Sequence, residues 1–196
     1  MWSEQKPVGR GALLLARHGQ TDDNLEPIRA QGFSDTPLNA VGRRQAHELA
    51  ERVAEVRVDG HPVASLHCSD LSRALDTARV VGQQIGLDPR PDPRLREGNR
   101  GDWEGRLFVD IDREDPDGYA AWLRAGPDFR FPGGESLQEQ SDRVAAALDE
   151  IRATAPLPAL IVCHRGSIRV VLCRSDPRGL NAFHEYDVPN VGLVEV

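Results

Sequence analysis

Two short apolar runs, each followed at once by a histidine, constrain this chain more than any other feature. A short apolar run bounded by turn residues predicts a buried strand. In a sheet of parallel strands, ligands bind beyond the carboxyl ends of the strands. We therefore expect His18 and His164 to face one pocket. The runs and their continuations are Ala12-Leu13-Leu14-Leu15 before Ala16-Arg17-His18-Gly19, and Leu160-Ile161-Val162-Cys163 before His164-Arg165-Gly166.

Strand patterns alternate with helix patterns along the whole chain, which favours an α/β fold. We predict a single three-layer α/β/α domain over residues 1–196, with a largely parallel central sheet. Residues 1–10 are expected to form a flexible N-terminal tail, and residues 98–132 a cap over the active site. The remaining expected elements are a helix over 39–56 capped by Asn39, a strand over 63–67, a helix over 69–85, a proline-rich loop over 88–93, short helices within 96–132, a helix over 136–153 opened by a Ser136–Glu139 capping box, a helix from Ser167 and a strand over 191–196.

The formal net charge of -7 argues against nucleic acid or an anionic membrane as a partner. No apolar stretch approaches the roughly 18 residues of a membrane span, and residues 1–6 lack the apolar core of a signal peptide. A cytoplasmic protein is therefore expected. Cys68, Cys163 and Cys173 are odd in number and match no zinc-binding spacing, so we expect neither disulfides nor a metal site.

Arg73 follows the third predicted strand, in the segment Ser69 to Ala78 that is expected to open a helix. A helix N-terminus attracts anions, and a guanidinium beside it can clamp a phosphate. The alternative is an arginine on an exposed helix face.

A non-helical stretch over residues 95–105 gathers carboxylates, three glycines and a tryptophan. A carboxyl group in an apolar environment can acquire a raised pKa and act as a general acid. Glu97, Asp102 and Glu104 are all candidates, and composition does not rank them.

Together these segments resemble the histidine phosphatase superfamily, in the branch that contains phosphoglycerate mutases and small phosphatases. The resemblance extends from residue 12 to Asn190, and its motifs occur in the order of the family. They are Arg17-His18-Gly19-Gln20-Thr21 with Asn24, Gln31-Gly32 before Thr36-Pro37-Leu38-Asn39, Ser69-Asp70-Leu71-Ser72-Arg73-Ala74, Leu95-Arg96-Glu97 with Gly101-Asp102-Trp103-Glu104-Gly105, Gly133-Gly134-Glu135-Ser136 and His164-Arg165-Gly166.

The resemblance implies a role for each matching residue. His18 corresponds to the nucleophile that becomes a phosphohistidine, and Glu97 corresponds to the proton donor. The phosphate clamp corresponds to Arg17, Arg73 and His164, with Asn24 as an additional donor. Further phosphate contacts are expected from Gln31, Gly32 and Arg165.

The resulting prediction is a metal-independent phosphatase without a cofactor, which hydrolyses phosphomonoesters of small metabolites. Homodimers are frequent among similar proteins. A phosphoglycerate mutase is the first alternative, although the interval from Glu97 to Gly133 is short for one. A second is a cysteine phosphatase, because Cys163 to Arg169 reads Cys-x5-Arg around a predicted strand-to-helix turn. A third is a binding module for phosphorylated ligands that does no chemistry.

Two positions depart from the family pattern. Arg165 stands where glycine is common, and Arg100 where an apolar residue is common. One interpretation is extra positive charge that selects a substrate with a second anionic group. The other is that both arginines face solvent or pair with Asp102 or Glu104, where an ion pair contributes little.

Overall fold

Strands β1 (Leu13–Arg17) and β4 (Ala159–Cys163) lie side by side in a five-stranded sheet with the order β3-β2-β4-β1-β5. The structure is a computed structural model that describes residues 12–196, so the predicted tail over residues 1–10 lies outside the described part. Strands β2 (Ser65–Cys68) and β3 (Arg90–Pro91) extend the sheet in parallel, and β5 (Leu193–Glu195) pairs antiparallel with β1. The predicted, largely parallel sheet is confirmed.

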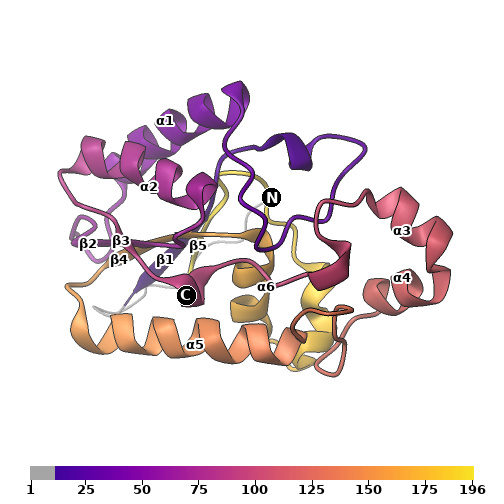
Figure 1. Ribbon diagram of the computed structural model, residues 1–196. Coiled ribbons are helices and arrows are strands. Elements are labelled where there is room, and N and C mark those ends of the chain that lie inside the picture. The colour runs from indigo at the N-terminus through magenta and orange to yellow at the C-terminus, as the bar shows by residue number, and fades with distance from the viewer. Residues whose placement is uncertain (1–11) are drawn as a thin grey trace.

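Helices cover both faces of this sheet, as Figure 1 shows. Helices α1 (Ala40–Glu55) and α2 (Ser72–Ile85) lie on one face, and α5 (Leu137–Thr154) and α6 (Arg165–Cys173) lie on the other. Because successive strand residues point to opposite faces, Leu14 packs with the first pair of helices and Leu13 with the second. The three-layer architecture therefore has a hydrophobic core on each side of the sheet.

The segment predicted as a cap, residues 98–132, carries two helices at one side of the sheet (Figure 1). These are α3 (Phe108–Glu114) and α4 (Pro116–Leu123), preceded by a 3-10 helix at Gly101–Trp103. The rings of Trp122 and Phe131 are 4.9 Å apart at their centroids, and both residues are buried. Aromatic packing therefore ties α4 to the domain.

Local sequence signals set where α1 and α5 begin, whereas several other elements differ from the sequence-based expectation. Asn39 caps α1 by accepting a hydrogen bond from the backbone of Gly42, and Ser136 forms the predicted capping box with Glu139. Helix α2 begins at Ser72 rather than Ser69, because the preceding Leu71 has extended backbone angles. The expected loop over 88–93 contains strand β3, which pairing with β2 creates. Helix α6 starts two residues before the predicted Ser167, and β5 is shorter than the predicted 191–196.

Three further 3-10 helices connect these elements, at Asp22–Asn24, Pro93–Leu95 and Gly179–Glu185. None of the helices formed by residues 12–196 is long and apolar enough to cross a lipid bilayer.

Candidate active site

The two predicted histidines lie next to each other at one edge of the sheet. In the parallel register Arg17 is the partner of Cys163, so the residues that follow each strand emerge together. The ring centroids of His18 and His164 are 5.1 Å apart, and both side chains are buried. The predicted convergence of the two imidazoles is therefore what the structure shows.

One hydrogen bond fixes the tautomer of His18. Its Nδ1 lies 2.6 Å from the carbonyl oxygen of Gly19. A carbonyl oxygen only accepts, so Nδ1 carries the proton and donates it. The lone pair of the neutral ring is therefore on Nε2, which makes Nε2 the nucleophilic atom.

The loop that holds this carbonyl is tightly packed. A Cβ atom at Gly19 would lie 2.3 Å from the carbonyl oxygen of Gly42 in α1. This is a steric clash, so only glycine fits at position 19. The backbone N–H of Gly19 donates to the hydroxyl of Thr77 in α2, at 3.1 Å. Helices α1 and α2 therefore fix the loop from which His18 projects.

Both histidines are held in the neutral form. Burial, then His164 and the guanidinium of Arg73, lower the pKa of His18 well below its ordinary value. Burial, then Arg73 and Arg143, do the same to the pKa of His164. A neutral imidazole is the form that nucleophilic attack requires.

Two buried arginines stand beside the histidines, each anchored at one end of its guanidinium. Arg17 donates through Nη1 to the carbonyl oxygen of Val188, and Arg73 donates to the carbonyl oxygens of Ser34 and Gly32. Among residues 12–196 the Nε atom of each arginine is buried and has no hydrogen-bond partner. Burial and the charge of Arg165 lower the pKa of Arg17 to about 9, and burial lowers the pKa of Arg73 to about 10. Buried donors of this kind are stabilised by an anion.

Glu97 is the one carboxylate of the three candidates that reaches the histidines' edge of the sheet. Its Oε2 accepts a hydrogen bond from the backbone N–H of Gly166, and its Oε1 accepts from the backbone N–H of Gly98 and from Nε2 of Gln140. A Cβ atom at Gly166 would lie 2.2 Å from Glu97 Oε1, so this approach needs glycine. Asp102 is exposed, and the carboxylate of Glu104 accepts hydrogen bonds from the backbone of residues 33, 34 and 100.

The charge state of Glu97 follows from a balance of opposing effects. Burial raises the pKa of this carboxyl group, but the positive charge of Arg100 and the N–H groups of Gly166 and Gly98 outweigh burial. The pKa of Glu97 therefore lies below its ordinary value. In the ligand-free protein Glu97 is a carboxylate.

His18, Arg17 and Glu97 line a small cavity of about 50 Å³, which we name the His18 cavity. The predicted residues Asn24 and Gln31 both line it, and Asn24 Nδ2 donates to Gln31 Oε1 at 3.4 Å. The predicted residues Gly32, Arg73 and His164 are not part of this lining, and the carbonyl oxygen of Gly32 accepts a hydrogen bond from Arg73. The lining residues are Arg17, His18, Asn24, Ile28, Arg29, Gln31, Glu97, Arg100, Phe108 and Arg165.

Sequence reasoning missed two residues that support the site. Gln140 bonds Glu97, and Arg143 donates to the carbonyl oxygens of residues 94, 96 and 97. A signal for Gln140 was present, because it is a polar residue on the inward face of an amphipathic helix, beside Leu137 and Val144. Arg143 gave no such signal, since arginines are common on exposed helix faces.

The competing cysteine site is not supported by the structure. Cys163 is fully buried in β4, and burial raises the pKa of its thiol to about 12. A nucleophilic cysteine needs a lowered pKa instead. Arg169, its expected partner, donates to the backbone carbonyl of Tyr186 and lies over the ring of Phe183.

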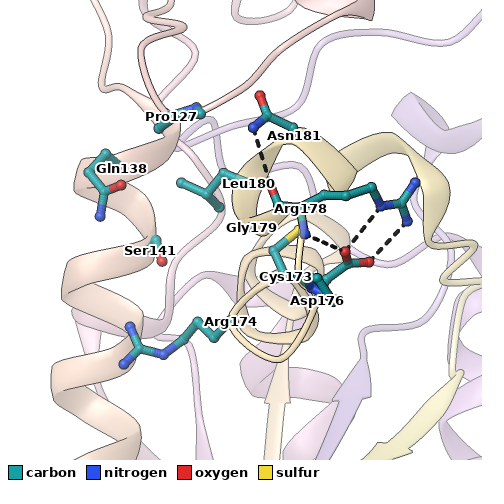
Figure 2. A pocket seen from close by; sticks show the side chains of 11 residues that line it. Pro127, Gln138, Ser141, Cys173, Arg174, Asp176, Arg178, Gly179, Leu180 and Asn181 are labelled. Atoms are coloured by element: carbon teal, nitrogen blue, oxygen red, sulfur yellow. Dashed lines mark hydrogen bonds and ion pairs between the residues drawn. The ribbon is translucent and has the colours of Figure 1, made fainter.

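A larger cavity of about 500 Å³ lies elsewhere, between the start of α5 and the end of α6 (Figure 2). Its carboxylate, Asp176, accepts hydrogen bonds from Arg178 and from the hydroxyl group of Tyr186. Burial raises the pKa of its thiol, Cys173, to about 11. The carboxylate of Asp176 is thus paired with Arg178, as Figure 2 shows, and volume alone does not make this cavity a reaction site.

Comparison with known proteins agrees with this geometry. The profile of the histidine phosphatase superfamily (branch 1) matches residues 13–196. An Escherichia coli protein named "Probable phosphoglycerate mutase GpmB" is 41% identical over 140 residues, which cover 71% of this chain and 62% of that protein. The match thus spans less than two thirds of this relative.

Solved structures of phosphatases share the fold. A mycobacterial glucosyl-3-phosphoglycerate phosphatase, solved as a complex with VO3, superposes with a TM-score of 0.83 at 31% identity, covering 94% of this chain and 90% of that one. The α-ribazole phosphatase from Shigella flexneri gives a TM-score of 0.79 at 29% identity, covering 94% and 89%. The chain therefore belongs to branch 1 of the histidine phosphatase superfamily.

Proposed function

We propose that this protein is a phosphatase that hydrolyses phosphomonoesters of small metabolites through a phosphohistidine on His18. The observation that carries the proposal is the orientation of His18. Its Nδ1 donates to the carbonyl of Gly19, which leaves Nε2 as the nucleophilic atom. Beside it are Arg17 and Arg73, whose Nε atoms have no hydrogen-bond partner within residues 12–196. Family membership supports a phosphoryl-transfer enzyme, and the phosphatases of similar fold favour hydrolysis.

In the first step, Nε2 of His18 forms a bond to phosphorus while the bond from phosphorus to the ester oxygen breaks. The guanidinium groups of Arg17 and Arg73, with His164, stabilise the negative charge on the transferred oxygens. Phosphorylation places positive charge on the imidazole ring. The carbonyl of Gly19 stabilises this charge through its hydrogen bond to Nδ1.

The departing alkoxide needs a proton, and Glu97 is the acid that we assign to it. Glu97 is ionised in the free protein, so the bound substrate must bring the proton. A phosphomonoester has a second pKa of about 6, and its monoanion carries one. The dianionic phosphate that remains raises the pKa of the adjacent carboxyl group, because like charges favour the protonated form.

In the second step, a water molecule attacks the phosphorus of the phosphohistidine. Glu97, now a carboxylate, removes a proton from this water, and the bond between Nε2 and phosphorus breaks. Neutral His18 results, and Glu97 returns the proton to the inorganic phosphate as it leaves, so Glu97 is again a carboxylate. We propose that no metal ion takes part, since arginines supply the positive charge, and we expect full activity after exhaustive chelation.

The direct test is to trap the intermediate. We expect rapid quenching with a labelled phosphomonoester to give an acid-labile, base-stable label on wild-type protein, and none on His18→Ala. The matched control is His47→Ala, which removes an exposed histidine of α1 and should label normally. Loss of labelling in Cys163→Ser with retention in His18→Ala would reverse the assignment of the nucleophile.

A phosphoglycerate mutase is the second candidate, favoured by the name of the relative matched over 140 residues. Both activities would use the same phosphohistidine, and they differ in the group that accepts the phosphoryl. We expect phosphorus NMR to show inorganic phosphate accumulating from 3-phosphoglycerate. Transfer of the phosphoryl group between carbon positions without free phosphate would establish the mutase instead.

A further inference from the structure

Arg100 lines the His18 cavity in a setting that is unusual for an arginine. Its guanidinium lies over the rings of Phe131 and Trp122, with the central carbon 4.8 Å and 5.1 Å from their centroids. Its Nε donates to the carbonyl oxygen of Gln31 at 3.1 Å. The Nη1 atom is buried and finds no hydrogen-bond partner among residues 12–196. A buried cationic donor left without a partner is costly, which indicates that an external group completes it.

Arg165, at the start of helix α6, lines the same cavity. It opens α6, directly after His164, and within the described residues it forms no ion pair. It lies close enough to Arg17 to be the largest charge effect on that residue's pKa, after burial. It also acts on Arg100, because its charge contributes to the lowered pKa of that group. The two arginines that depart from the family pattern thus line one cavity.

The acidic residues nearby do not neutralise this pair. Glu104 directs its carboxylate to backbone N–H groups of residues 33, 34 and 100, and the exposed Asp102 forms no ion pair within residues 12–196. The interpretation that Arg100 forms a surface ion pair with either of them is therefore not supported.

The charge of the cavity lining also exceeds what a phosphate group needs. The lining contains four arginines and one carboxylate, that of Glu97. A bound phosphomonoester compensates part of the excess. The remaining positive charge favours a ligand with one more negative group, and a planar carboxylate pairs with guanidinium in a bidentate geometry.

Arg100 and Arg165 line the same cavity as His18, so a group that they bind would lie close to the ester. One water occupies about 30 Å³ of the liquid, so a cavity of about 50 Å³ holds a group the size of one small anion. A second anion would then have to lie at the edge of this cavity, joined to the ester by a short linker.

From these contacts we propose that Arg100 and Arg165 form a second anion subsite, which selects phosphomonoesters that carry a carboxylate a few bonds from the ester oxygen. This proposal rests on the proposed phosphatase function. It names the substrate class of that same site, and it assigns a specificity role to two arginines.

The test compares two substrates that differ in one group. 3-Phosphoglycerate and glycerol 3-phosphate differ by a carboxylate in place of a hydroxymethyl group, and phosphate release measures kcat/KM for each. We expect wild-type protein to prefer 3-phosphoglycerate by about 10- to 100-fold, the range of a charge-assisted pair. In Arg100→Leu and in Arg165→Leu we expect this ratio to fall at least about fivefold.

The matched control is Arg113→Leu, which removes an exposed arginine of α3 outside the cavity and should keep the wild-type ratio. If the Arg100 variant does not fold, an inhibition assay on the wild-type protein still tests the subsite. 3-Phosphoglycerate should then inhibit hydrolysis of p-nitrophenyl phosphate more strongly than glycerol 3-phosphate does. Equal inhibition, or a wild-type ratio near one, would overturn the subsite.

The arms also separate the two proposals. If the protein hydrolyses p-nitrophenyl phosphate but does not prefer 3-phosphoglycerate to glycerol 3-phosphate, the subsite is refuted and the phosphatase function is retained. No hydrolysis of any of the three esters sinks the proposed function. A preference for 2,3-bisphosphoglycerate over 3-phosphoglycerate that Arg100→Leu removes would assign the subsite to phosphate and overturn the carboxylate selectivity.

Discussion

Glu97 illustrates how a single side chain acquires its chemistry from its surroundings. A buried carboxyl group would ordinarily be neutral, yet Arg100 and two backbone N–H groups keep this one ionised. The proton that the reaction needs is therefore not stored on the free protein. The chemistry of the residue becomes that of an acid only once a phosphate with its own proton has bound.

This ordering predicts the pH dependence of kcat/KM. The reactive pair is ionised Glu97 with the substrate monoanion, and the monoanion disappears above the second pKa of the ester, at about pH 6. We expect kcat/KM to fall roughly tenfold per pH unit from about pH 6.5 to about pH 8.5, as free-enzyme and free-substrate ionisations dictate. Steady-state assays at constant ionic strength measure it, with circular dichroism to confirm an unchanged fold. A profile that rises or stays flat over this range would contradict the assignment.

At the scale of elements, helix α5 does more than cover the sheet. Its Gln140 donates to Glu97 at 3.1 Å, and its Arg143 holds the backbone of the turn that carries Glu97. The capping box at Ser136 fixes where α5 begins. It therefore also fixes the positions of Gln140 and Arg143 along the helix. The acid is therefore positioned from a helix that contributes nothing to the lining of the His18 cavity.

We predict that Gln140→Leu raises the pKa of Glu97, because the ionised form loses a hydrogen bond. A titration of labelled glutamate carboxyl groups by carbon NMR measures the shift, and we expect kcat to fall about tenfold. The control is Gln138→Leu, two positions earlier on the exposed face, where the side-chain amide donates to Asp142 and not to Glu97. A loss of activity with no change in the pKa of Glu97 would reduce Gln140 to a packing role.

The elements also show which features the sequence can predict. The helices over 40–55 and 137–154 follow from caps and periodicity, which are local. Strand β3 does not, because its proline-rich segment is a strand only through its pairing with β2. Likewise, composition does not distinguish Glu97 from Asp102 or Glu104, since the choice depends on which carboxylate the fold brings to the start of α6. Contacts between residues far apart in the sequence decide both the formation of β3 and the choice of Glu97.

For the whole molecule, burying two neutral histidines couples stability to pH. His18 and His164 have a pKa well below 6.5 in the folded state, and the unfolded chain returns them to about 6.5. Below that pH the unfolded state binds protons that the folded state does not. Stability is therefore highest above about pH 6.5 and declines as the pH falls.

Each of these histidines should cost at most about 1.4 kcal/mol of unfolding free energy per pH unit below about 6.5. We expect urea denaturation to show a shallower decline between about pH 6 and pH 5 in His18→Gln than in wild type. The exposed His47→Gln, which has no buried ring to protonate, should keep the wild-type slope. Equal slopes in all three proteins would show that buried histidines do not set the acid sensitivity.

The parallel pairing of β1 with β4 has a consequence for how the protein comes to be active. The two imidazoles belong to opposite ends of the polypeptide, and only closure of the sheet between these strands brings them together. An amino-terminal fragment that ends before β4 therefore lacks His164 and cannot form the site. Recovery of turnover during refolding should consequently lag behind formation of the helices and coincide with completion of the sheet.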